Sequence, residues 1–242
     1  MQLSLLIVDT CENKKSHRDD VEIFSPIVDI RIASYAYVRY FGSSSVSKVN
    51  IMCISDYLKD GVLDALKVLK SSKKITDDSF VLQVIYEDLK NFKRAGDTQL
   101  FITGSVERSE EKDSSQTVCY ELAEETRFEP QKKKSIELLV TCQTKSEKVD
   151  WFACPISNLR YIGPTPARKT EKMSYSYKIA CIVYGTEDEM VNAISSIPKN
   201  SSRGNDRIKG LVCMRFTDVE SLTLRIVKRQ LAGKKGTIAW FG

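Results

Sequence analysis

Short apolar runs rich in β-branched and aromatic residues recur along this chain, interleaved with stretches of helical periodicity. Strand-like runs occupy residues 28–41, 48–55, 79–86, 98–103, 135–143, 149–156, 177–185 and 210–216. Apolar residues at helical spacing cover residues 56–72, 116–127, 187–197 and 218–231. Most strands follow one another through short loops. The pattern therefore predicts an α/β (α+β) fold, a sandwich with a mixed sheet between helices.

The domain organisation is predicted from length and from the lack of a clear linker. A chain of 242 residues is long enough for one large domain or two small ones. We expect one domain with insertions over residues 28–242. The apolar run at residues 3–8 is typical of a buried strand, and residues 1–27 form either a separate arm or part of the core.

Cysteine and histidine usage excludes several kinds of site. The seven cysteines are odd in number, form no CxxC pair and lie mostly in apolar runs, which predicts reduced, buried thiols in the cytoplasm or another reducing intracellular compartment. The single histidine, His17, lies in a polar segment, so a Cys-His or Ser-His-Asp site has no support. No apolar run approaches the roughly 20 residues that span a bilayer. Catalysis would need carboxylates, lysines, tyrosines or a metal ion.

Three glutamates stand close together in the helical stretch 116–127. Glu121, Glu124 and Glu125 are spaced i, i+3 and i+4, which places them on adjoining parts of one helical face at 3.6 residues per turn. Their carboxylates repel one another, and Mg²⁺ or Mn²⁺ would relieve that repulsion. By spacing alone, a solvated glutamate cluster is the commoner explanation of the pattern.

The residues around this helix resemble the Nudix box. Gly104 is followed after five residues by Glu110, and the helix then supplies Glu121, Leu122, Glu124, Glu125 and the closing apolar Phe128. The strand ending at Gly104 takes the place of the family's strand before its glycine turn. The motif covers about 25 residues, and weaker resemblance extends from about residue 30 to the C-terminus. It implies a Nudix-like α/β/α sandwich.

Three positions depart from the family pattern. The loop between Glu110 and the helix is two residues longer, Tyr120 stands where the family has arginine, and Arg127 stands where it has glycine. In the family the arginine orients a neighbouring glutamate through a salt bridge. The resemblance therefore also allows a fold that has lost its activity.

The resemblance implies a metal-dependent pyrophosphohydrolase that cleaves a nucleoside diphosphate linked to another moiety. Glu121, Glu124 and Glu125 would be the catalytic carboxylates and would bind Mg²⁺ or Mn²⁺ directly or through water. The Gly104 carbonyl would complete the metal site, and Glu110 would support the loop or bind an ion. The general base stays open among Glu187, Asp188, Glu189 and Asp206.

The substrate is predicted only as a class. The net charge is +5, and Lys132, Lys133 and Lys134 directly follow the acidic helix, which suits a nucleotide or another phosphate-rich substrate, RNA included. Trp151 is a candidate for stacking on a base. The chain is longer than the family's members for small nucleotides, which favours capped RNA.

Two other classes of protein remain as alternatives. One is a catalytically silent Nudix fold that binds RNA or protein, which Tyr120 and Arg127 favour. The other is an unrelated structural or assembly protein whose glutamate cluster is a coincidence.

Overall fold

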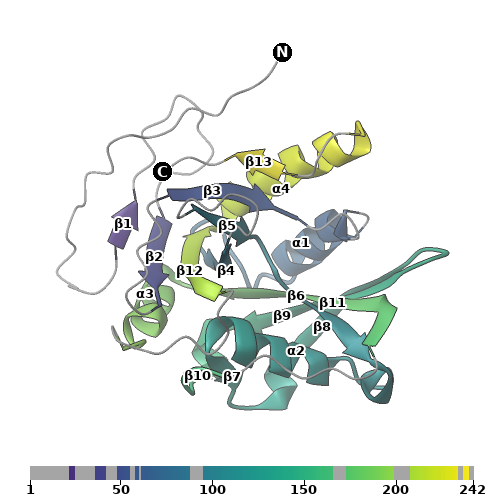
Figure 1. Ribbon diagram of the computed structural model, residues 1–242, viewed down its shortest axis with the longest axis horizontal. Helices are drawn as coiled ribbons and strands as arrows, with labels where there is room; N and C mark the ends of the chain where they lie inside the picture. The colour runs from purple at the N-terminus through teal and green to yellow at the C-terminus, as the bar shows by residue number, and fades with distance from the viewer. Residues whose placement is uncertain are drawn as a thin grey trace.

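The computed structural model of this protein confirms a mixed sheet with flanking helices. Two helices, α1 (Val62–Ser71) and α4 (Phe216–Leu231), lie on one side of the sheet, and α2 (Ser115–Glu121) and α3 (Glu187–Ser195) lie on the other (Figure 1). The structure describes residues 22–24, 36–41, 48–54, 58–59, 61–87, 95–165, 173–198, 208–233 and 237–239.

The main path of the sheet combines antiparallel strands with one parallel pair. Its order is β1 (Glu22–Phe24), β2 (Ala36–Tyr40), β12 (Ile208–Arg215), β4 (Phe80–Glu87), β11 (Met173–Gly185), β9 (Lys148–Pro155) and β8 (Glu137–Gln143). β11 and β9 are parallel, and the other neighbours on this path are antiparallel. The pairing of β1 with β2 joins part of the N-terminal segment to the sheet.

The sheet branches at β11, and this branch positions the candidate site. The end of β11 pairs with the start of β4, in the register Val183 with Leu82. Earlier in β11, residues 178–181 pair with β6 (Ile102–Glu107). The second half of β4 pairs instead with β5 (Ala95–Gln99), which continues to β3 (Lys48–Cys53) and β13 (Thr237–Ala239). β4 and β6 therefore diverge from a common neighbour.

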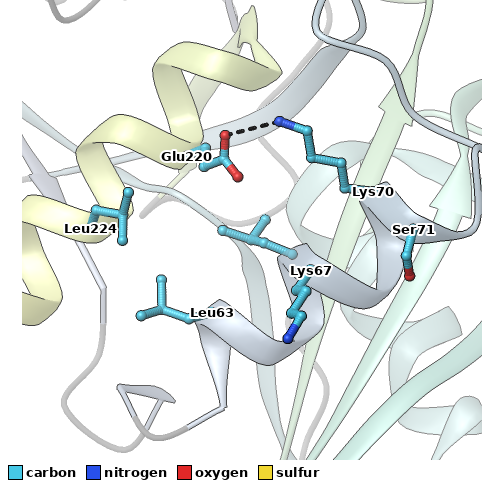
Figure 2. Close-up of a pocket in the computed structure, with 7 residues that line it drawn as sticks. Leu63, Lys67, Lys70, Ser71, Glu220 and Leu224 are labelled. Atoms are coloured by element: carbon cyan, nitrogen blue, oxygen red, sulfur yellow. Dashed lines mark hydrogen bonds and ion pairs between the residues drawn. The ribbon is translucent and has the colours of Figure 1, made fainter.

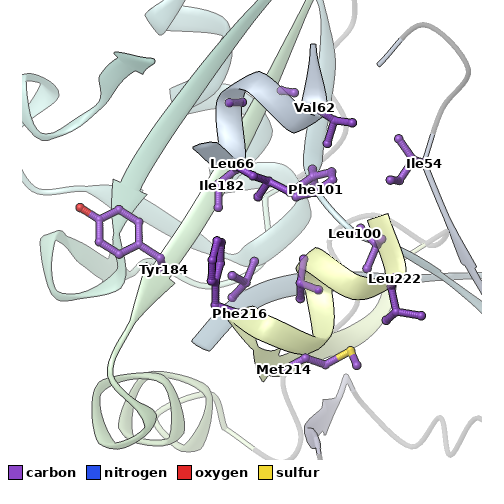
Figure 3. Close-up of a cluster of buried hydrophobic side chains, with 14 of the residues drawn as sticks. Ile54, Val62, Leu66, Leu100, Phe101, Ile182, Tyr184, Met214, Phe216 and Leu222 are labelled. Carbon is purple, nitrogen blue, oxygen red and sulfur yellow. The ribbon is translucent and has the colours of Figure 1, made fainter. Parts of the chain in front are cut away.

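Two hydrophobic cores fill the spaces between the sheet and its helices. The core under α1 and α4 contains Leu66, Phe101, Ile182 and Phe216 (Figure 3). Trp151 belongs to the same core. The core under α2 and α3 contains other side chains, and alternate residues of β4 contribute to both. Because both faces of the central strands are covered, these strands are almost continuously apolar.

The helices form where the apolar spacing predicts them. Helix α1 buries Val62, Ala65, Leu66 and Leu69, and the preceding Leu58 is buried as well, all as expected from the sequence. Helix α3 begins with a capping box, in which the Thr186 side chain accepts a hydrogen bond from the Glu189 amide and the Glu189 carboxylate accepts one from the Thr186 amide. No helix of the described residues is long and apolar enough to cross a membrane.

Two stretches outside the predicted strands and helices also contain regular structure. In residues 105–115, β6 continues to Glu107, and Glu110 and Ser114 are buried. Further along the chain, β10 (Leu159–Tyr161) pairs with β7 (Phe128–Pro130). The apolar run at residues 3–8, His17 and Asp206 lie outside the described residues.

All five cysteines whose side chains the structure describes are free thiols, and the predicted burial is confirmed for three of them. Cys154, Cys181 and Cys213 are buried free thiols, while Cys119 and Cys142 are half-buried and also free. Burial raises the pKa of the Cys154 thiol to about 12, so this group is unreactive near neutral pH.

Candidate functional site

The glutamate-bearing segment packs against the sheet through its apolar residues. Val118 and Leu122 are fully buried, and Cys119 is half-buried. The segment is not one uniform α-helix, because α2 ends at Glu121 and a π-helical turn, η3 (Leu122–Thr126), follows. The wider turn changes the directions of Glu124 and Glu125 from those that 3.6 residues per turn would give.

The segment ends in a left-handed residue. Arg127 has φ of 70° and ψ of 17°, a conformation that glycine adopts without steric cost. This is the position at which the sequence pattern has glycine. The Arg127 guanidinium stacks on the Phe41 ring, 3.5 Å from its centroid, and is buried beside Tyr161. Burial lowers the pKa of Arg127, whereas its hydrogen bond with Tyr161 opposes that shift.

Glu125 is the most deeply buried of the three glutamates. Only 6% of it is exposed, and its Oε1 accepts a hydrogen bond from the Tyr86 hydroxyl on β4. A backbone hydrogen bond from Thr103 on β6 also reaches this carboxylate. Glu125 therefore sits where β4 and β6 diverge.

The electrostatics of Glu125 disfavour its charge. Burial raises the pKa of Glu125 well above its ordinary value, and the nearby Glu121 and Glu124 carboxylates raise it further, although the Tyr86 hydrogen bond opposes them. Burial and the same three carboxylates raise the pKa of the Tyr86 hydroxyl. These interactions show that the three carboxylates lie in one electrostatic neighbourhood.

Gly104 is needed for the close approach of Glu121. A Cβ atom at position 104 would collide with the Glu121 carboxylate. Gly104 is paired with Ile179 in the sheet. The glycine is therefore needed because it has no side chain, and not because the backbone takes an unusual conformation. The structure thus places Glu121 against Gly104, and it places Glu121 and Glu124 within electrostatic reach of Glu125.

Glu110 contributes to the loop before α2. It is buried and accepts a hydrogen bond of 2.7 Å from the Thr117 hydroxyl in the first turns of that helix. Of the two roles expected for Glu110, this contact fits loop support.

A buried aspartate that the sequence analysis did not single out fixes the start of α2. Asp150 accepts hydrogen bonds of 2.6 Å from Ser114 and from Thr141, and another from the Tyr177 hydroxyl. Lys148 lies 3.9 Å from the same carboxylate. The available sequence signal is the single acidic residue inside an apolar strand, because a buried charge needs hydrogen-bond partners.

The expected substrate-binding residues are not gathered at the glutamates. The prediction that Trp151 stacks on a substrate base is wrong. Its side chain is fully buried in the core under α1, where it makes an edge-to-face contact with Phe101. Lys133 forms an exposed ion pair of 2.7 Å with Asp113, before the start of α2. Lys132 is exposed as well. Both lysines follow β7, and neither has a contact with the three glutamates.

The candidates for a general base lie at the start of α3. Glu187 accepts a hydrogen bond from the Tyr37 hydroxyl, and Glu189 caps its own helix, which occupies that carboxylate.

A divalent ion suits the chemistry of the glutamate cluster. The Glu125 Oε2 atom is buried without a hydrogen-bond partner, and hard cations take carboxylate oxygens. However, in the part of the chain that the structure describes, no group of three or more His, Cys, Asp or Glu side chains is already arranged to hold a metal ion. The glutamate oxygens are thus the type of ligand that such an ion takes. The carboxylates would have to move closer together to coordinate it.

A groove lies on the opposite side of the sheet from the glutamates. This groove of about 390 Å³ runs between α1 and α4 and is lined mainly by apolar atoms, with the Lys70–Glu220 ion pair at 3.4 Å beside it (Figure 2). It contains no carboxylate cluster, so the glutamates remain the candidate site.

In comparisons with known proteins, no family model, no curated protein and no solved structure matches this chain.

Proposed function

We propose that this protein is a divalent-metal-dependent pyrophosphohydrolase of the Nudix type, which cleaves a nucleoside diphosphate linked to another moiety. The observation that carries the proposal is the convergence of Glu121, Glu124 and Glu125 beside Gly104, with one oxygen of Glu125 buried and unpartnered. The left-handed conformation of Arg127, where the resembled pattern has glycine, supports the same assignment.

The proposed roles follow from the positions of the side chains. Glu121, Glu124 and Glu125 would hold Mg²⁺ or Mn²⁺, and the Gly104 carbonyl is a further candidate ligand. The ion would neutralise charge on the pyrophosphate and lower the pKa of an attacking water. Glu110 and Asp150 would hold α2 in place through their hydrogen bonds with Thr117 and Ser114.

A substrate screen tests the proposal. The full chain is incubated with Mg²⁺ or Mn²⁺ and with nucleotide sugars, dinucleoside polyphosphates or capped RNA, and phosphate-containing products are measured. We expect metal-dependent turnover of at least one class and a loss of at least about 100-fold in kcat for Glu124→Gln and Glu125→Gln. Glu111→Gln, which changes an exposed glutamate in the loop before α2, is the matched control and should retain activity.

The alternative is a silent fold of the same type that binds RNA or protein. Tyr120, at the position where the resembled pattern has arginine, is 49% exposed, which favours a contact surface at this point. Absence of turnover on every substrate class with both metals contradicts the proposed hydrolase. Salt-sensitive retention of RNA in the same experiments would then support the alternative.

A further inference from the structure

The hydroxyl of Tyr86 meets the glutamate cluster from a separate element of the fold. Tyr86 is near the end of β4, whereas Glu125 belongs to η3, and 39 residues separate them in the sequence. The hydroxyl donates to Glu125 Oε1. The other oxygen of the same carboxylate, Oε2, is buried and has no hydrogen-bond partner.

The hydrogen bond from Tyr86 to Oε1 also sets the direction of the Oε2 atom of Glu125. A carboxylate can rotate about its last torsion, and a hydrogen bond to one oxygen fixes where the other points. With Oε1 held by Tyr86, Oε2 is the atom left available to a cation. Hydrogen-bond donors behind a metal-binding carboxylate typically set both its direction and its affinity.

We propose that Tyr86 is a positioning residue that holds Glu125 so that its Oε2 atom binds a divalent cation. The inference rests on the proposed function, since it assigns a cation to the same glutamates. It adds a residue that lies outside the glutamate-bearing segment and that the sequence pattern does not mark.

The test compares two tyrosine hydroxyls that each donate to a buried carboxylate. Tyr86→Phe removes the donor to Glu125, and Tyr177→Phe removes the donor to Asp150 as the matched control. Binding of Mn²⁺ alone is titrated by electron paramagnetic resonance, and thermal melts check that each variant is folded. We expect a loss of Mn²⁺ affinity of about 10–100-fold for Tyr86→Phe. The affinity of Tyr177→Phe should fall by much less, because its hydroxyl is linked to α2 only through Asp150 and Ser114.

A double-mutant cycle separates positioning from a general effect on the fold. If Tyr86 acts through Glu125, Tyr86→Phe should cause no further loss of Mn²⁺ affinity once Glu125→Gln is present. The double variant carries no carboxylate at position 125 to bury, so it keeps the test available if the single variant folds poorly.

Each outcome decides between the two proposals. Unchanged Mn²⁺ affinity in a folded Tyr86→Phe variant, with metal-dependent turnover intact, overturns the role of Tyr86 and leaves the hydrolase standing. Equal losses in the Tyr86 and Tyr177 variants, or additive losses in the cycle, also overturn it. If the unmodified protein binds no Mn²⁺, both proposals fail.

Discussion

Glu125 combines deep burial with two acidic neighbours, and this combination makes it costly to ionise. Burial and the charges of Glu121 and Glu124 raise its pKa above the ordinary value of 4.5. A carboxyl group whose pKa rises on folding stabilises the protein below its unfolded pKa. That contribution is lost as the pH rises through the folded pKa. A residue kept for function at the expense of stability behaves in this way.

Replacing Glu125 by glutamine should therefore stabilise the metal-free protein at neutral pH. The amide keeps an acceptor for Tyr86 and carries no charge, so we expect a higher melting temperature, by about 2–4 °C for each kcal/mol of relief. The difference should shrink as the pH falls towards 4.5, where the native carboxyl is protonated as well. Thermal melts from pH 4 to pH 8 measure this, with Glu111→Gln as the control. A destabilised Glu125→Gln at pH 7 would contradict the account.

Arg127 allows a test of backbone strain at the end of the same segment. Both Arg127→Gly and Arg127→Ala remove the stacking on Phe41, but only alanine retains the cost of a Cβ atom at φ of 70°. The glycine variant should therefore be more stable than the alanine variant by about 1 kcal/mol. Urea denaturation measures the difference between the two. Equal stability would mean that position 127 carries no strain.

At the scale of elements, the placement of α2 depends on contacts that are distant in sequence. Asp150 on β9 joins the residue before α2, strand β8 and strand β11 through the hydroxyls of Ser114, Thr141 and Tyr177. Helix α2 has only seven residues, too few for a helix to be stable by itself in water. Its position must come from such contacts and from burial of Val118.

Asp150→Asn should weaken this anchor while preserving the volume of the side chain. The amide NH₂ cannot accept a hydrogen bond, so at least one buried hydroxyl loses its acceptor, and we expect a loss of about 1–3 kcal/mol in the free energy of unfolding. Urea denaturation measures the loss, and Asp113→Asn, which changes an exposed carboxylate, is the control. A loss as small as that of the control would show that the network contributes little to stability.

Local patterns predicted the elements better than they predicted their partners. The buried stripe of α1 follows from helical spacing alone, because one face of that helix packs on the sheet. Trp151 shows the limit of this reasoning. Residues 149–154 of β9 are all buried, so the strand has no alternation of apolar and polar residues from which the direction of the Trp151 side chain could be predicted. The π-helical turn after Glu121 also had no local signal, although turns of this kind are frequent at functional sites.

At the scale of the whole molecule, the branch of the sheet creates the site. Thr103 on β6 and Tyr86 on β4 reach Glu125 only because β11 pairs with both strands at different points of its length. Such pairing joins residues that are 66 to 105 positions apart in the chain, for example Met173 with Glu107 and Gly185 with Phe80, and no stretch of sequence encodes it alone. The glutamate cluster could therefore be predicted from the motif, whereas its partner Tyr86 could not.

The central claim is that Glu121, Glu124 and Glu125 together bind a divalent cation. Titration with Mn²⁺, followed by electron paramagnetic resonance, tests it on the unmodified chain and on variants that replace each of the three glutamates by glutamine. The account predicts saturable binding by the unmodified protein and by Glu111→Gln, and affinity at least about tenfold weaker in each of the three variants. Equal binding by all of these proteins, or none by the unmodified chain, would contradict it.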